Sequence, residues 1–147
     1  SGDDVCRCVH PEFGAAPGTL ISLGIVSEDR RCEFYEVLPY DNIEDEWVKE
    51  NVIPILQKEP ISLEEFHDRL AKFLGQFARL HFIANHVNDM VYTGKAMDMG
   101  KGKQVVELPT IFELNHELSG KGSKMLHNAL FDARATLDDW ERLNGVN

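Results

Sequence analysis

The residues best suited to chemistry lie in three separated segments of the chain. They are His10 and Glu12 near the start, Asp89 in the middle, and His127 with Asp132 near the end. Carboxylates gathered in one place raise one another's pKa, and bound divalent cations remove that conflict. Two such ions roughly 4 Å apart can clamp a phosphodiester, while a histidine takes a proton from the attacking water. These residue types therefore indicate metal-dependent phosphodiester hydrolysis, provided that the fold brings the segments together.

The elements that would position these residues are read from the hydrophobic pattern. β-prone and alternating runs predict strands over residues 4–12, 19–26, 32–38, 80–84 and 104–108. Helical spacing predicts helices over 62–78, 87–97 and 128–143, with a short helix over 44–56. Ser62 and Glu65 form a capping box at the start of the helix over 62–78. Residues 111–118 are expected to be a short helix or irregular.

The order of these elements predicts an α/β fold. Short connections join the first three strands, which favours a three-strand antiparallel meander. Two further strands then alternate with helices, so we expect one mixed sheet with helices on both faces. The first and fourth strands can lie side by side with the last helix across them. Glu12, Asp89, Asp132 and His127 would then meet at one point.

Size, charge and cysteine content narrow the class of protein. The 147 residues fit a single domain over 1–147, and residues 1–4 are expected to be flexible or tag-derived. No apolar run is long enough to cross a membrane, and three cysteines without a disulfide pattern favour a reducing, cytoplasmic setting. The net charge of −10 argues against a protein that coats nucleic acid. It suits both a carboxylate metal site and an acidic protein that binds a basic partner.

The strongest pattern lies at the end of the chain. His127-x4-Asp132, followed by Ala133-Arg134, resembles the third motif of the DEDDh 3′–5′ exonucleases, which include oligoribonuclease, ribonuclease T and polymerase proofreading subunits. We therefore identify the chain as similar to this superfamily, closest to its small bacterial and phage members. The resemblance implies a ribonuclease-H-like fold.

Two further segments extend the resemblance over residues 5–143. Asn85-x3-Asp89 resembles the second motif, and Glu12-Phe13 resembles the end of the first, which reads Asp-x-Glu before an aromatic residue. The run over residues 19–26 resembles the second strand of the family.

The resemblance implies a role for each matched residue. Glu12 would ligate a metal ion and take part in catalysis, Asp132 would ligate the first ion, and Asp89 would hold the second. His127 would be the general base. The implied cofactors are two Mg²⁺ or Mn²⁺ ions, and the implied activity removes nucleotides one at a time from the 3′ end of RNA or single-stranded DNA.

The chain departs from the family at position 10, where the family has an aspartate that touches both ions. An imidazole binds a divalent ion through one nitrogen, brings no negative charge and cannot bridge two ions. Mn²⁺ tolerates a nitrogen ligand better than Mg²⁺ does. His10 therefore leaves three readings open: a weakened enzyme, an enzyme with altered metal preference that holds one ion, or an inactive nuclease fold that binds nucleic acid or protein.

Other residues are secondary candidates. Phe13 and Tyr92 are each expected either to stack on a terminal base or to lie in the core, and Asn85 is a candidate substrate contact. The acidic run around Trp47 is most simply a solvated helix face. Expected partners are the 3′ end of single-stranded nucleic acid and either a second copy of the chain or another protein.

Overall fold

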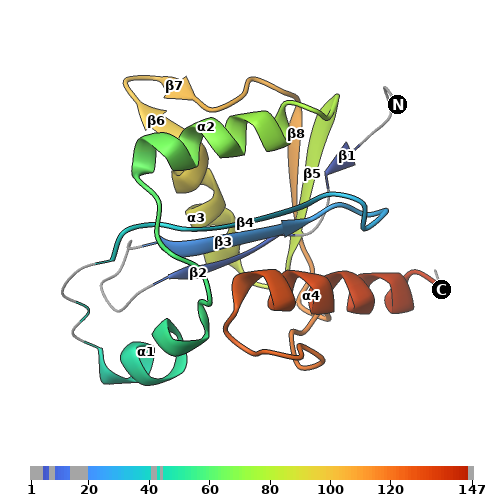
Figure 1. Ribbon diagram of the computed structural model, residues 1–147. Helices are drawn as coiled ribbons and strands as arrows, with labels where there is room; N and C mark the ends of the chain where they lie inside the picture. The colour runs from blue at the N-terminus through green and yellow to red at the C-terminus, as the bar shows by residue number, and fades with distance from the viewer. Residues whose placement is uncertain (1–4, 7–8, 14–19, 41–42, 44, 146–147) are drawn as a thin grey trace.

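The computed structural model describes the backbone of residues 5–6, 9–13, 20–40, 43 and 45–145, and side chains from residue 20 onward within these ranges. This part is a mixed α/β structure with four α-helices (Figure 1). Its strands are β1 (Val5–Cys6), β2 (Val9–Phe13), β3 (Leu20–Val26), β4 (Glu33–Val37), β5 (Arg79–Ala84), β6 (Asp98–Gly100), β7 (Lys103–Gln104) and β8 (Thr110–Leu114). Its helices are α1 (Glu46–Asn51), the 3₁₀ turn η1 (Ile53–Ile55), α2 (Leu63–Leu74), α3 (Val87–Met97) and α4 (Ala129–Leu143).

In the described part of the chain the strands form two three-stranded sheets and one hairpin, where the sequence predicted one mixed sheet. Strands β2, β3 and β4 make an antiparallel sheet in that order, so the predicted meander is confirmed. Strands β1, β5 and β8 make a parallel sheet in that order, and β6 pairs with β7. Strand β2 also contacts β5, so the N-terminal segment touches both larger sheets.

Helices cover both faces of the meander, as predicted. Leu23 and Ile25 of β3 pack with Phe66 and neighbouring residues of α2. The alternate residue Val26 packs on the other side with Ala133 and Leu137 of α4. Figure 1 shows α2 and α4 on opposite sides of β3.

Local sequence signals fix most helix ends. The hydroxyl of Ser62 accepts a hydrogen bond from the backbone N–H of Glu65, which confirms the cap of α2. This helix ends at Leu74 rather than near residue 78, although Phe77 still lies in the core. Helix α1 is also shorter than predicted, because Val52 and Pro54 pass directly into η1.

The prediction for the fifth strand was wrong. Residues 103–104 form half of a small hairpin, and the strand beside β5 is Thr110–Leu114, in the segment expected to be a short helix or irregular. The alternation of buried and exposed side chains that marks a half-buried strand is missing here, because Ile111, Phe112 and Leu114 are all exposed. The sequence signal therefore failed at an edge strand.

No helix among the described residues is both long enough and apolar enough to span a lipid bilayer.

Candidate functional site

The start of α4 lies directly on strand β3. A Cβ atom added at Gly24 would stand 2.5 Å from the backbone carbon and oxygen of Ala129 and 2.6 Å from the nitrogen of Leu130. Only glycine allows so close an approach. His10 of β2 pairs with Gly24 across the sheet, so the backbone of the first motif runs beside the start of this helix.

Asn128 fixes how α4 begins. Its side-chain oxygen accepts hydrogen bonds from the backbone N–H groups of Leu130 and Phe131, and its amide nitrogen donates to the carbonyl of Ile55 at 2.9 Å. Only 2% of the residue is exposed. The cap therefore joins the helix start to η1, a role that sequence reasoning did not assign to this residue.

His127 and Asp132 lie together, as their spacing predicts. The backbone N–H of His127 donates to Oδ2 of Asp132 at 3.0 Å. The carboxylate of Asp132 is buried in the first turn of α4, where the positive end of the helix dipole favours a negative charge. His127 has φ of 75°, a left-handed conformation that is strained for a residue with a side chain. The structure thus holds the backbone of His127 next to the acid.

Trp47 contacts His127 from α1. The two rings meet edge to face, with 4.7 Å between centroids, and Trp47 is 52% exposed. The acidic sequence around Trp47 predicts a solvated helix face and does not reveal this contact. The two residues are far apart along the chain, so their spacing cannot predict the contact. The one signal in the sequence was a large aromatic residue in an otherwise acidic segment.

Asp89 occupies the corresponding position at the start of α3. It is buried in the first turn of that helix, and its backbone N–H donates to the carbonyl of His86. The imidazole of His86 caps the helix by accepting from the N–H of Asn88. Asn85, the secondary candidate, is half-buried in the bend between β5 and α3.

The first motif lies on β2, whose backbone is described while its side chains are outside the described part. Strand β2 contacts both α3 and α4, so the backbones of the three predicted segments adjoin. His10 pairs with Gly24, Glu12 with Ser22, and Phe13 with Leu20. The convergence of the side chains of His10, Glu12 and Phe13 on Asp89 and Asp132 remains a prediction.

Ser22 adds a polar group where β2 and β3 pair. It lies on the same face of β3 as Gly24, toward α4, and is fully buried. Its hydroxyl has no hydrogen-bond partner among the described side chains. A buried polar atom usually has a partner, so a group opposite Ser22 is expected to supply one.

The carboxylate oxygens of Asp89 and Asp132 are of the kind that Mg²⁺ or Mn²⁺ binds. Within the residues whose side chains are described, no three His, Cys, Asp or Glu side chains lie close enough to hold a metal ion. A metal site at these helix starts would need a further ligand, and Glu12 is the carboxylate that β2 carries.

Tyr92 and Arg134 are engaged elsewhere. Tyr92 is buried, with the ammonium of Lys95 5.3 Å from its ring centre, so the core reading is favoured over base stacking. Arg134 donates two hydrogen bonds to Glu33, at 2.6 and 2.7 Å. These bonds lower the pKa of Glu33 and raise that of Arg134.

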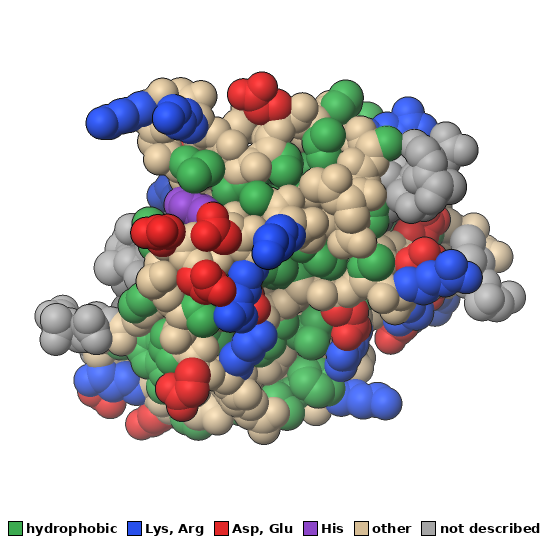
Figure 2. All heavy atoms as spheres, turned by 45° about the horizontal axis from the view of Figure 1, so that its top comes forward, with side chains coloured by type: hydrophobic (Ala, Val, Ile, Leu, Met, Phe, Trp, Pro, Cys, Tyr) green, Lys and Arg blue, Asp and Glu red, His purple; other side chains and the backbone are tan. Residues whose placement is uncertain are grey.

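On the face that carries α2, Figure 2 shows a short row of Lys and Arg side chains with Asp and Glu side chains beside it. Arg69 of α2 there bridges Glu65 and Glu36, and Lys58 also contacts Glu36.

Comparison with protein-family models, curated proteins and solved structures finds no match to this chain.

Proposed function

We propose that the chain is a metal-dependent 3′–5′ exonuclease of the DEDDh type, acting on RNA or single-stranded DNA. One observation carries the proposal. Two buried carboxylates, Asp89 and Asp132, occupy the first turns of two helices that both contact the strand bearing His10 and Glu12. This is the arrangement of segments that the three motifs require.

The strand arrangement supports the ribonuclease-H-like part of the proposal. The antiparallel meander ends on β2, and the parallel sheet ends on β1, which precedes β2 in the same N-terminal segment. A ribonuclease-H-like sheet would unite the two, with this segment in the centre. The contact between β2 and β5 is in keeping with that order.

In the proposed site, Glu12, Asp89 and Asp132 would hold Mg²⁺ or Mn²⁺. When bound, the metal supplies positive charge for the phosphodiester and lowers the pKa of a water molecule. His127, held beside Asp132, would take the proton from the attacking water.

Trp47 gives the proposed site a surface for single-stranded substrate. Its exposed indole lies against His127, so a base stacked on it would lie close to the proposed base catalyst. Aromatic stacking holds unpaired bases with little regard for sequence. This supports a substrate with an unpaired end.

His10 favours a second candidate function, a nuclease-like domain that binds nucleic acid without cleaving it. The site would lack the bridging carboxylate, while Asp89, Asp132 and Trp47 would still offer a metal and a base-binding surface. A gel shift of the labelled oligonucleotide without its shortening distinguishes this candidate from the first.

The test is digestion of 5′-labelled single-stranded RNA and DNA, with Mg²⁺ and with Mn²⁺. We expect stepwise shortening from the 3′ end by the native protein, faster with Mn²⁺, and its loss in Asp132→Asn and Asp89→Asn. The control is Asp138→Asn on the same helix as Asp132, because the Asp138 carboxylate is 62% exposed. Equal activity in native and Asp132→Asn proteins would refute the site, and absence of cleavage by all of them would refute the enzyme.

A further inference from the structure

Strand β8 is an edge strand with an unusual surface. It pairs with β5 on one side, and no strand in the described part of the chain pairs with its other side. Ile111 is 61% exposed, Phe112 40% and Leu114 37%. Edge strands in soluble proteins are usually protected by lysine, proline or a bulge. Thr110–Leu114 contains no lysine, proline or bulge, and its one charged residue, Glu113, is paired with His81, so the edge is open and largely apolar.

The hydrogen-bonding groups on the open side can be assigned. The carbonyl of Pro109 accepts from the N–H of Leu80, and the N–H of Asn115 donates to Ala84, both at 2.9 Å. Odd-numbered residues of β8 thus direct their backbone groups toward β5. In a parallel ladder the residues between them point the other way. Thr110, Phe112 and Leu114 therefore present N–H and C=O groups to the open side.

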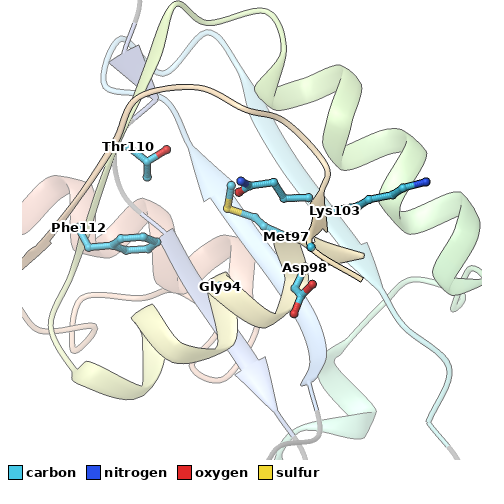
Figure 3. A pocket seen from close by; sticks show the side chains of 8 residues that line it. Gly94, Met97, Asp98, Lys103, Thr110 and Phe112 are labelled. Atoms are coloured by element: carbon cyan, nitrogen blue, oxygen red, sulfur yellow. The ribbon is translucent and has the colours of Figure 1, made fainter. Parts of the chain in front are cut away.

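A cavity adjoins this open edge. Its volume is about 330 Å³, and Thr110 and Phe112 line it together with Met97 at the end of α3 and Lys103 of the β6–β7 hairpin. Figure 3 shows the side chains of Thr110 and Phe112 on the cavity side of β8, facing Met97 across the opening. A strand added to the edge would place alternate side chains over this cavity.

We propose that the open edge pairs with β8 of a second copy of this chain, antiparallel and about a twofold axis at Phe112. This register pairs the whole of β8. It sets Phe112 opposite its own counterpart and Thr110 opposite Leu114 of the second copy. Every backbone N–H on the open side of one copy then meets a C=O of the other copy. Leu114 of each copy covers the cavity beside Thr110 of the other.

The charges along β8 agree with a second copy as the occupant. The chain carries a net charge of −10, which makes two copies repel, so an interface between them must add no unpaired like charges of its own. Glu113 is the single charged residue of β8, and its carboxylate contacts His81 of the same chain at 3.0 Å. In the proposed register Glu113 lies opposite Ile111, so no like charges face each other.

The test is the mass of the native protein by sedimentation velocity over a wide concentration range, beside two matched variants. Phe112→Lys sets two lysines opposite each other at the axis and is expected to abolish the dimer. Ile111→Lys changes a more exposed residue of the same strand, but it sets lysine opposite Glu113 and is expected to leave the dimer intact. Circular dichroism checks that each variant is folded.

Phe112 also packs on Phe82, with 5.2 Å between ring centroids, so its replacement can disturb the core. Thr110→Pro provides a second test, because it removes one outward N–H and leaves the bonds to β5 in place. Dissociation of both Phe112→Lys and Thr110→Pro supports the proposal. A native protein that is monomeric at all concentrations, or a dimer that survives both changes, overturns it. Nuclease activity is measured separately, since the interface does not depend on it.

Discussion

At the scale of single residues, His127 shows what spacing along a chain can reveal. Its separation from Asp132 predicts that the two lie together, and the structure joins them through a backbone hydrogen bond. Both residues belong to one helix start, so local sequence is sufficient. Trp47 is different: its contact with His127 depends on how α1 and α4 pack, and no local pattern encodes that.

Trp47 gives a prediction at the same scale. Trp47→Ala should lower kcat/KM for single-stranded oligonucleotides by about tenfold or more, because a stacking contact contributes about 1–3 kcal/mol. Trp47→Phe keeps an aromatic ring and should retain most of the activity. Steady-state kinetics on short labelled oligonucleotides measures both. An alanine variant as active as the native protein would exclude substrate contact and any positioning of His127 by this ring.

At the scale of elements, the close contact between β3 and α4 holds the proposed site in place. Gly24→Ala should lower the free energy of unfolding by about 3 kcal/mol, because the added methyl group meets the backbone of Ala129. Gly94→Ala is the control. It lies inside α3 with no other atom within 4 Å of the added Cβ and should raise stability by about 0.5–1 kcal/mol.

Urea unfolding followed by circular dichroism measures both glycine variants. The Gly24 variant should also lose nuclease activity, since the start of α4 would shift away from β2. If its stability and activity match those of the native protein, α4 does not lie on β3 as described.

The ion pair of Glu33 with Arg134 joins β4 to α4 and should make stability depend on pH. The hydrogen bonds from Arg134 hold the pKa of Glu33 below its ordinary 4.5 in the folded protein. Because the folded pKa is the lower one, the pair stabilises the fold above the ordinary value, and this contribution fades as pH falls through the lowered value. Both side chains are about one-third exposed, so the contribution is small.

Glu33→Gln should therefore lower the free energy of unfolding by about 0.5–1 kcal/mol near neutral pH. The difference from the native protein should disappear in strongly acidic solution, where Glu33 is protonated in both states. Urea titrations at the two pH values measure it, with Glu28→Gln in the β3–β4 turn for comparison. A difference that persists in acid would mean that the ion pair is not its cause.

At the scale of the whole molecule, the sequence predicts the mixed α/β class, the antiparallel meander and helices on both faces. These features follow from hydrophobic periodicity and short connections, which are local. The strand beside β5 was misplaced, because its side chains are exposed at an open edge and the periodicity is lost. If β8 joins a second copy, the missing alternation has a physical reason: the strand is exposed only in the isolated chain.

The central claim is that β2, α3 and α4 together form a metal site for phosphodiester hydrolysis. The N-terminal segment departs from the expected metal site at one position, because His10 stands where a bridging carboxylate is expected. A substitution that supplies the carboxylate tests the claim by gain of activity, which a loss of folding cannot imitate.

The decisive measurement is the rate of Mg²⁺-dependent 3′ shortening of a labelled oligonucleotide by His10→Asp. We predict a rate at least about tenfold above that of the native protein, which corresponds to an activation free energy lower by ~1.4 kcal/mol. His10→Asn, of similar shape but uncharged, should show no gain, and His10→Asp combined with Asp132→Asn should lose it. A rate for His10→Asp no higher than that of His10→Asn, or a gain that survives the loss of Asp132, would contradict the site proposed for this chain.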